Sequence, residues 1–455
     1  MRVSKPRSPC RAAAPPLDLL ARMTEEKKLP QGRLSRFARL AATGVRTGAG
    51  LLFDKDGSAG AKQAAEVLGT LRGLAAKVGQ MASYVDGVIP EDHRQAYETA
   101  LSALRAQAPT SSPAAIRATV EEELGAPVGE LFAQWDDVPM ASASIGQVHR
   151  ARMADGLEVA VKVQHPGIQK AVESDLSSAS ILETIASIGG ARRFKTNDVL
   201  AVIKERFREE LDYALEAERI QHFTRVHAGD PTIRIPALVA SRSSKRVLTT
   251  ALVRGMSFEE ACANPSEGAR RAWAETMWRF VFKGNLVGGQ FNADPHPGNY
   301  IFHDHGKVTF LDYGCVQRID AVRTRWARAL HRAAVERDAE TFRASVRGMI
   351  SSKPGRLEDM AIDYTRRCFS PLFESPFRMT RAYAASLVEG MKDMALVGRK
   401  VDESEFFTMP PDMVFINRLQ FGFYSVLARM DVEVDYAAVE SAFMADASGD
   451  AGRAA

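Results

Sequence analysis

The most constraining feature of this chain is a pair of aspartate motifs in its second half. The segment NADPHPGN at 292–299 places Asp294 five residues before Asn299, and LDYG follows with Asp312. Two prolines and a glycine rule out a regular helix through 292–299, so both polar side chains are expected on a rigid loop. Phosphoryl transfer with Mg²⁺ needs a carboxylate near the attacking hydroxyl, and carboxylate and amide oxygens that bind the metal. The spacing therefore predicts Asp294 as a catalytic residue and Asn299 and Asp312 as magnesium ligands.

A strand lysine and a loop of small residues precede these motifs. The run VAVK ends at Lys162, within a predicted β-hairpin over 139–165 that turns at Asp155-Gly156. A strand lysine reaches the α- and β-phosphates of ATP when a helix carboxylate holds it. The preceding loop keeps the frame GxGxxGxV, with alanine at the first two glycine positions. The residues predicted to contact ATP are Ala141, Ser142, Ala143, Ser144, Ile145, Gly146, Val148 and Lys162.

Each of these signals has an ordinary explanation when it stands alone. Turns rich in Ala and Ser are common, a lysine that ends an apolar strand is usually an edge charge, and aspartates in loops usually form Asx turns. Their shared order and spacing favour one ATP–Mg²⁺ site over four unrelated features. The alanines carry a Cβ that keeps the backbone away from phosphates, so we expect an altered nucleotide preference.

The order of predicted elements indicates an α+β protein with a bilobal, protein-kinase-like fold. Ser112 and Pro113 predict the start of a helix that Gly125 ends, and 197–222 predicts a long charged helix. The predicted units are a basic, partly disordered arm with an amphipathic helix (1–60), a helical extension (61–110), an N-lobe with a helical insert (111–252), a mostly helical C-lobe with the catalytic and metal loops (253–445) and a disordered tail (446–455).

Composition excludes several classes of protein. The net charge of +4 over 455 residues is too weak to indicate nucleic-acid binding. Four scattered cysteines, without a CxxC pair, predict neither a disulfide framework nor a structural zinc site. No apolar stretch approaches the ~18 residues of a membrane-spanning helix. We therefore expect a cytoplasmic protein.

The first fifty residues differ from the rest in charge. They hold eleven Lys or Arg and three Asp or Glu, and Leu34, Phe37 and Leu40 recur at helical spacing beside arginines. A basic amphipathic helix can lie on an anionic membrane surface, whereas a solvated arm docked on the protein is the ordinary alternative. If the helix lies on a membrane, the expected location is the cytoplasm with peripheral association with the membrane.

Together these motifs resemble the UbiB/AarF family of atypical kinase-like ATPases, which is linked to ubiquinone biosynthesis and lipid homeostasis. Lys77-Val78-Gly79-Gln80 matches the family motif KxGQ, and Glu210-Leu211-Asp212 matches its ExD motif. The alanine-rich loop at 141–148 also distinguishes this family from ordinary protein kinases. The resemblance covers roughly residues 60–430.

The resemblance implies further roles for individual residues. Lys162 is expected to pair with Glu216. The implied catalytic residues are therefore Asp294, Lys162 and Glu216. A regulatory set is expected to form where the extension folds over the site and blocks the groove for a protein substrate. Its members are Lys77, Gln80, Glu210 and Asp212. ATP and Mg²⁺ are the implied cofactors, and quinone-pathway lipids or enzymes are the implied partners.

Two other functions remain open from the sequence. The segment DPHPGN also resembles the loop of aminoglycoside and choline kinases, which are small-molecule phosphotransferases, but those enzymes lack KxGQ and ExD. A pseudokinase scaffold that binds nucleotide without turnover is the third possibility. Retention of Lys162, Asp294, Asn299 and Asp312 favours turnover instead.

Overall fold

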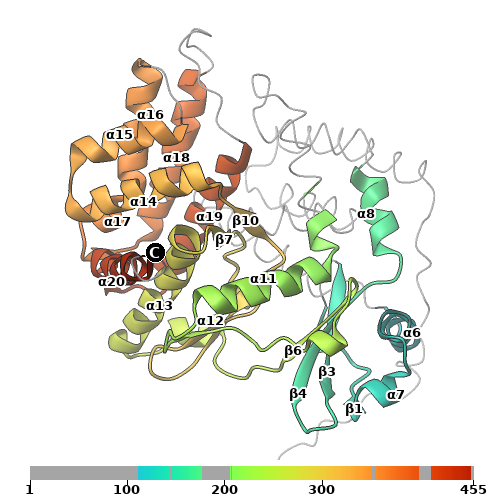
Figure 1. Cartoon of the computed structure of the whole chain (residues 1–455). Helices are drawn as coiled ribbons and strands as arrows, with labels where there is room; N and C mark the ends of the chain where they lie inside the picture. Colours follow the sequence, from blue (N-terminus) through green and yellow to red (C-terminus); the bar gives the residue numbers. More distant parts are fainter. Residues whose placement is uncertain are drawn as a thin grey trace, which may run out of the picture.

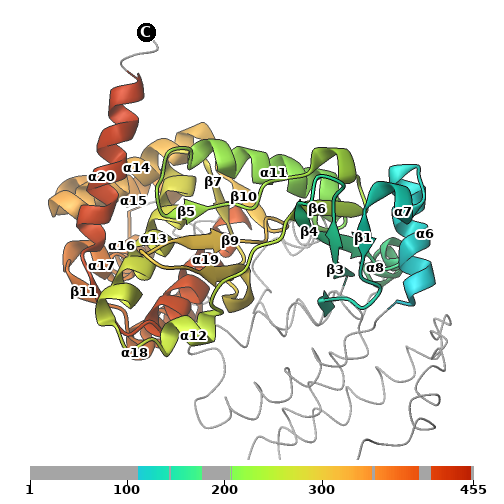
Figure 2. The ribbon, with the colours of Figure 1, turned by 90° about the horizontal axis from the view of Figure 1, so that it is seen from below.

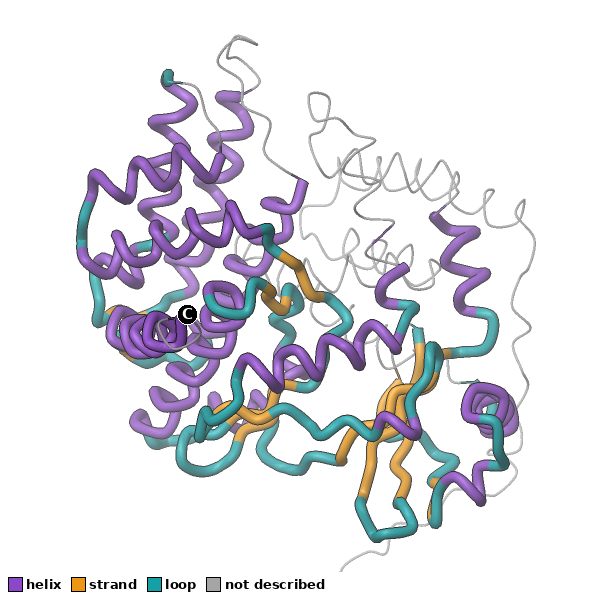
Figure 3. Tube along the Cα trace, in the orientation of Figure 1, coloured by secondary structure: helices purple, strands orange, loops and turns teal. Residues whose placement is uncertain are grey.

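The structure, a computed structural model, describes residues 111–142, 145–176, 205, 208–350, 354–398 and 411–451. These residues form two lobes, a smaller one built on a five-stranded sheet and a larger helical one (Figure 1). Coloured by secondary structure, the longer strands gather in the smaller lobe and helices fill the larger one (Figure 3). The predicted α+β, bilobal kinase-like fold is confirmed. The expected arm and helical extension lie outside the described residues.

The N-lobe sheet is antiparallel throughout and has the order β1-β3-β4-β6, with β2 paired to β3. The central hairpin is the one that the sequence predicts at 139–165, and Gly156 takes a left-handed φ of 89° in its turn. Its strands are β1 (Gln134–Trp135), β2 (Ala141–Ser142), β3 (Gly146–Arg152), β4 (Glu158–Gln164) and β6 (Val247–Ala251).

The alternation of β4 decides which way its lysine points. Val159, Val161 and Val163 are fully buried on one face, in a core that includes Ile116 of helix α6 (Pro113–Leu124). Because successive strand residues point to opposite faces, Lys162 lies on the other face. The hydrophobic core of the N-lobe thus orients Lys162 away from α6.

Helix α6 has the ends that the sequence predicts. The Ser112 side chain accepts a hydrogen bond from the Ala115 N–H, Pro113 occupies the first turn, and Gly125 ends the helix with a left-handed φ of 74°. The other helical elements of the N-lobe are α7 (Val128–Leu131), α8 (Ile168–Leu176), α11 (Tyr213–Val226) and the short 3₁₀ helix η1 (Ala240–Arg242).

Helix α11 lies between the two lobes in both views (Figures 1 and 2). It packs against β6 of the N-lobe and against α13 (Glu267–Leu286) of the C-lobe. The sequence predicts a continuous helix over 197–222. The structure contradicts its continuity, because the helix is interrupted at 211–212. Asp212 is extended and caps α11, so the helix begins at Tyr213 and runs on to Val226.

The C-lobe contains most of the remaining elements and three small sheets. β5 pairs in parallel with β9, which pairs with β8, so the chain contacts the C-lobe at 233–234 before it returns to the N-lobe sheet as β6. The elements are β5 (Ile233–Arg234), α12 (Phe258–Cys262), α13, β7 (Gln290–Asn292), η2 (Pro297–Asn299), β8 (Tyr300–Phe302), β9 (Val308–Phe310), β10 (Val316–Arg318), α14 (Ala321–Glu336), α15 (Ala339–Ile350), α16 (Arg356–Cys368), α17 (Ser370–Phe373), β11 (Phe377–Arg378), α18 (Arg381–Gly398), α19 (Pro411–Ala428), β12 (Glu433–Val434) and α20 (Tyr436–Ala451).

Helix α20 extends beyond residue 446, where the sequence predicts a disordered tail, and it ends at Ala451. Its Glu440 is fully buried and accepts hydrogen bonds from Trp278 at 3.0 Å, while His331 lies 2.8 Å from its other oxygen. This contact ties α20 to α13 and α14. Within the described part of the chain, no helix combines the length and the apolar character that crossing a membrane requires.

A buried histidine ends α11 on the C-lobe side. His227 is 4% exposed, and its ring stacks on Phe280 and Phe223 with centroids 5.0 and 6.1 Å away. Neither ring nitrogen has a hydrogen-bond partner among the described residues. Burial lowers the pKa of His227 to about 3, and the charge of Lys283 acts in the same direction. The ring is therefore neutral in the folded protein at neutral pH.

This histidine predicts a loss of stability in acid. In the unfolded chain it titrates near its usual pKa of about 6.5, so below that pH the unfolded state binds one more proton than the folded state. We expect His227→Phe to make the fall of the unfolding free energy between pH 6 and pH 4 shallower by about 1.4 kcal/mol per pH unit. Urea unfolding followed by circular dichroism measures this slope. His305→Asn, at an exposed position with φ of 59°, is the control, and an equal slope in both variants would contradict the assignment.

Candidate functional site

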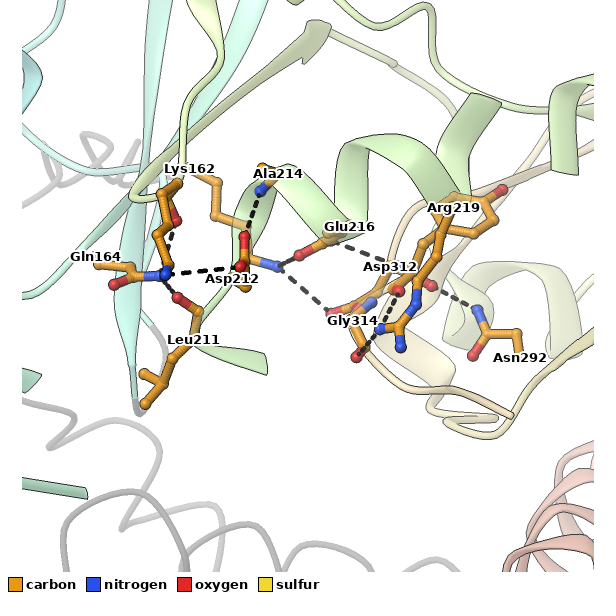
Figure 4. A network of polar contacts seen from close by, with 12 residues as sticks. Lys162, Gln164, Leu211, Asp212, Ala214, Glu216, Arg219, Asn292, Asp312 and Gly314 are labelled. Atoms are coloured by element: carbon orange, nitrogen blue, oxygen red, sulfur yellow. Dashed lines mark hydrogen bonds and ion pairs between the residues drawn. The ribbon is translucent and has the colours of Figure 1, made fainter. Parts of the chain in front are cut away.

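Three of the predicted site residues meet between the lobes. The Lys162 ammonium donates to both carboxylate oxygens of Glu216, at 3.0 and 2.9 Å, and Asp312 Oδ2 lies 3.9 Å from the same nitrogen (Figure 4). Lys162 comes from β4, Glu216 from the first turn of α11 and Asp312 from the loop after β9. The predicted pairing of Lys162 with Glu216 is confirmed, across 54 residues of sequence.

Exposure differs sharply among these three side chains. Glu216 is 3% exposed, whereas Lys162 and Asp312 keep 24% and 31% of their side-chain surface accessible. Burial would lower the pKa of Lys162, but the carboxylates of Asp312 and Glu216 outweigh it and raise that pKa well above its usual value. Lys162 is therefore a fixed cation. Both carboxylate oxygens of Glu216 bind the Lys162 ammonium, whereas the carboxylate of Asp312 remains accessible for a ligand.

The loop before Lys162 lies on the same side of the sheet. Val148 is the direct cross-strand partner of Lys162, so both side chains share one face. Ala141 and Ser142 form β2 and pair with Val148 and Gln147. Ala143 and Ser144 lie outside the described residues, and Ile145 and Gly146 complete the loop.

Packing explains why this loop keeps its third glycine. A Cβ on Gly146 would lie 2.5 Å from the carbonyl oxygen of Val163 and 2.8 Å from the hydroxyl oxygen of Tyr213. Tyr213 is fully buried, and its ring lies beneath the Lys162 ammonium, 4.9 Å from nitrogen to centroid. The glycine is thus required by close contact with β4 and α11, in addition to any contact with a nucleotide.

The glutamine of the loop motif, Gln147, is buried in the N-lobe. Gln147 is 1% exposed; its Oε1 accepts from the N–H of Ser111 at 3.0 Å, and its Nε2 donates to His149 at 2.8 Å. The Ser111 hydroxyl also bonds to His165 at 2.9 Å. This network anchors Ser111, which follows the predicted extension directly, to β3 and to the residue after β4.

The segment 292–299 is held by its own amide side chains. Asn292 Oδ1 accepts from the N–H of Asp294 at 3.0 Å, and its Nδ2 donates to the carbonyl oxygen of Asp312 (Figure 4). Asn299 Nδ2 donates to the carbonyl oxygen of Asp294 at 3.1 Å. Asn299 ends one turn of 3₁₀ helix, η2, where the sequence predicts a rigid loop without helix. Asn292 therefore joins the Asp294 loop to the Asp312 loop, a role that the sequence does not reveal.

The tyrosine of LDYG is part of the core. Tyr313 is fully buried, with its ring centroid 5.2 Å from that of Phe223 on α11, and its hydroxyl donates to the carbonyl oxygen of Phe310 at 3.1 Å. Its backbone N–H lies 3.5 Å from Glu216 Oε1. Asp312 Oδ1 accepts from the N–H of Gly314 at 2.8 Å. The buried tyrosine thus keeps the Asp312 loop next to α11.

The acidic residues before α11 have structural contacts of their own. Asp212 Oδ1 accepts from the N–H groups of Ala214 and Leu215, so it caps the helix that carries Glu216. Gln164 donates to the carbonyl oxygen of Leu211 at 2.7 Å, which ties this segment to β4. Glu210 is buried, and the predicted contacts with Lys77 and Gln80 lie outside the described residues.

Comparisons with known proteins agree with this architecture. Residues 103–346 match the ABC1 atypical kinase-like domain. A solved structure of a Mycobacterium tuberculosis protein, Rv3197 in complex with erythromycin, aligns with a TM-score of 0.56 at 24% identity, covering 89% of this chain and 97% of that one. At that identity the likeness supports the kinase-like fold alone.

Sequence relatives lead to the same family. An uncharacterized Mycobacterium tuberculosis protein is 37% identical over 210 residues, which cover 45% of this chain and 43% of that protein. Atypical kinase COQ8B, mitochondrial, of Rattus norvegicus is 30% identical over 319 residues, covering 66% of this chain and 59% of COQ8B. This chain thus matches only about half the length of these curated relatives. The resemblance to UbiB/AarF proteins is confirmed, and the chain belongs to the ABC1 atypical kinase-like family.

Proposed function

We propose that this protein binds Mg-ATP between its lobes and hydrolyses it, or transfers its γ-phosphoryl group, in support of isoprenoid-quinone metabolism at a membrane surface. The observation that carries the proposal is the convergence of Lys162, Glu216 and Asp312 from three separate elements. A lysine held by a buried glutamate, beside an accessible aspartate, is the arrangement that kinase-type phosphoryl transfer requires.

The donor set fits a magnesium ion that arrives with a triphosphate. In the described part of the chain, no three His, Cys, Asp or Glu side chains gather in a way that would hold a metal by themselves. Mg²⁺ is usually held by one or two carboxylates together with substrate phosphates and water. Asp312 and Asn299 would supply the protein ligands, and the ion would neutralise charge on the phosphates.

The remaining roles follow from charge and position. The fixed cation of Lys162 would stabilise negative charge on the nucleotide phosphates, and Glu216 would keep its ammonium in place. Asp294, on the loop ordered by Asn292 and Asn299, would accept the proton of the attacking hydroxyl or water. Lys77, Gln80, Glu210 and Asp212 would control access to this site as the regulatory set.

A turnover assay on the full chain tests the proposal. Phosphate release from ATP is measured with Mg²⁺, with and without anionic liposomes and small phenols. We expect magnesium-dependent hydrolysis that liposomes or phenols stimulate, because the proposed ligands are membrane-borne quinone precursors and the basic arm at 1–60 would meet an anionic surface. Nucleotide binding without any turnover would contradict the enzymatic assignment and support a scaffold.

A small-molecule phosphotransferase is the second candidate, because the catalytic segment reads DPHPGN as in aminoglycoside and choline kinases. Mass spectrometry of the assay mixture distinguishes the two. A phosphorylated phenol or amino alcohol formed in step with ADP would favour this alternative. Free phosphate formed in step with ADP would favour hydrolysis.

A further inference from the structure

A buried arginine on α11 contacts the backbone of the Asp312 loop. Arg219 lies three residues after Glu216 and is 7% exposed. Its Nη1 donates to the carbonyl oxygen of Gly314 at 2.8 Å and lies 3.5 Å from that of Tyr313 (Figure 4). The contact with Gly314 spans 95 residues of sequence. Glu216 and Arg219 thus approach the same loop, one through the lysine and one through the backbone.

The same guanidinium also binds the segment before α11. Its other terminal nitrogen, Nη2, donates to the carboxylate of Glu209, which is 22% exposed. Glu209 immediately precedes the Glu210-Leu211-Asp212 motif, and its carbonyl oxygen accepts from the N–H of Asp212. The carboxylate compensates the charge that burial removes from water, and the planar fork directs two donors toward two fixed acceptors. One side chain therefore joins the acidic segment 209–212 to the Asp312 loop.

Gly314 transmits the position of Arg219 to the aspartate. The N–H of Gly314 donates to Asp312 Oδ1, while the carbonyl oxygen of the same residue accepts from Arg219. A movement of Gly314 would therefore disturb the hydrogen bond at Oδ1 and shift the carboxylate of Asp312, whose Oδ2 lies 3.9 Å from the Lys162 nitrogen. Asn292 holds only the backbone carbonyl of Asp312. The Gly314 contact at Oδ1 and the Lys162 ammonium beside Oδ2 both orient the carboxylate.

We propose that Arg219 is a positioning residue for the magnesium ligand Asp312, and that Glu209 orients Arg219. This proposal rests on the proposed function, because it assigns how the same site is held ready for Mg-ATP. It extends that function to two residues outside the kinase-like motifs. Arg219 and Glu209 act on metal affinity, so nucleotide binding without metal is left nearly unchanged.

Nucleotide titrations of the full chain test the proposal. ATP binding is measured by calorimetry with Mg²⁺ and with EDTA for wild type, Arg219→Met, Arg219→Lys and Glu209→Gln. We expect Arg219→Met to weaken binding in Mg²⁺ by about 10- to 100-fold, the range for lost support of a metal ligand, with little change in EDTA. Arg219→Lys retains the charge but lacks the planar fork that spans the Gly314 carbonyl and the Glu209 carboxylate, so it should weaken magnesium-dependent binding as well.

A matched control separates positioning from general destabilisation. Arg347→Met removes the arginine partner of Glu358, a carboxylate that is 3% exposed, in a pair formed between helices α15 and α16. It should leave binding in Mg²⁺ unchanged. Should Arg219→Met fail to fold, Arg219→Lys and Glu209→Gln carry the comparison.

The outcomes distinguish this proposal from the proposed function. Wild-type protein whose ATP affinity is the same in Mg²⁺ and in EDTA would overturn the proposed function, and this proposal with it. If magnesium tightens binding equally in wild type and in the Arg219 and Glu209 variants, the positioning role is wrong while the proposed function stands. An equal loss in Arg347→Met would also overturn the positioning role.

Discussion

Replacing Asp312 with asparagine is expected to lower ATP turnover by about 10³-fold while leaving the fold intact. The amide removes the negative charge that would hold Mg²⁺, and a metal contact of this kind contributes several kcal/mol to transition-state stabilisation. About 4 kcal/mol corresponds to 10³-fold in rate. Asparagine keeps an oxygen that can accept from the N–H of Gly314, so the loop retains its 2.8 Å hydrogen bond.

Turnover and thermal unfolding are measured together for this variant. Asp359→Asn is the control, because Asp359 is an exposed carboxylate whose arginine partner, Arg343, is 3.4 Å away on the C-lobe surface. It should match wild type in both measurements. Turnover by Asp312→Asn within a few-fold of wild type would show that Asp312 does not bind the metal.

Removing the lysine is expected to have the largest effect on stability. Lys162→Met leaves the carboxylate of Glu216, which is 3% exposed, without its cation, and breaking a buried ion pair on one side costs about 3–5 kcal/mol. The double variant Lys162→Met/Glu216→Leu removes both charges and should recover most of this loss, since apolar groups of similar volume often replace a buried pair without cost. Nucleotide binding should remain weak in both variants.

A double-mutant cycle in urea, combined with the thermal shift induced by Mg-ATP, measures both effects. The coupling between the two sites isolates their interaction from the loss of packing. A single variant as stable as wild type would contradict the buried pair. A double variant that bound Mg-ATP as tightly as wild type would show that Lys162 stabilises the fold and has no role toward phosphate.

The sequence predicted the parts of the site that depend on residue type and spacing. Asp294, Asn299 and Asp312 were recognisable because two prolines and a glycine exclude a regular helix and because each motif has few chemical uses. The pairing of Lys162 with Glu216 followed from the family resemblance, and the buried valines of β4 explain why the lysine faces α11. The helix α6 was predictable because its caps are local.

Contacts that join side chains to a distant backbone could not be predicted. Arg219 follows Glu216 by three residues, a spacing that is ordinary on a solvent-exposed helix, and a carbonyl oxygen at Gly314 has no sequence signature. The contact of Asn292 with the carbonyl oxygen of Asp312 could not be predicted for the same reason. The break at 211–212 in the helix expected over 197–222 could not be predicted, because the charged residues there favour helix throughout, whereas the Asp212 cap fixes the start of α11 at Tyr213.

A crystal structure of the full chain with Mg²⁺ and a non-hydrolysable ATP analogue tests the central claim most directly. It should place the phosphates beside the Lys162 ammonium, with the metal bound by Asp312 and Asn299 and with the Lys162–Glu216 contact retained. Nucleotide bound elsewhere, or a metal ion that touches neither Asp312 nor Asn299, would contradict it.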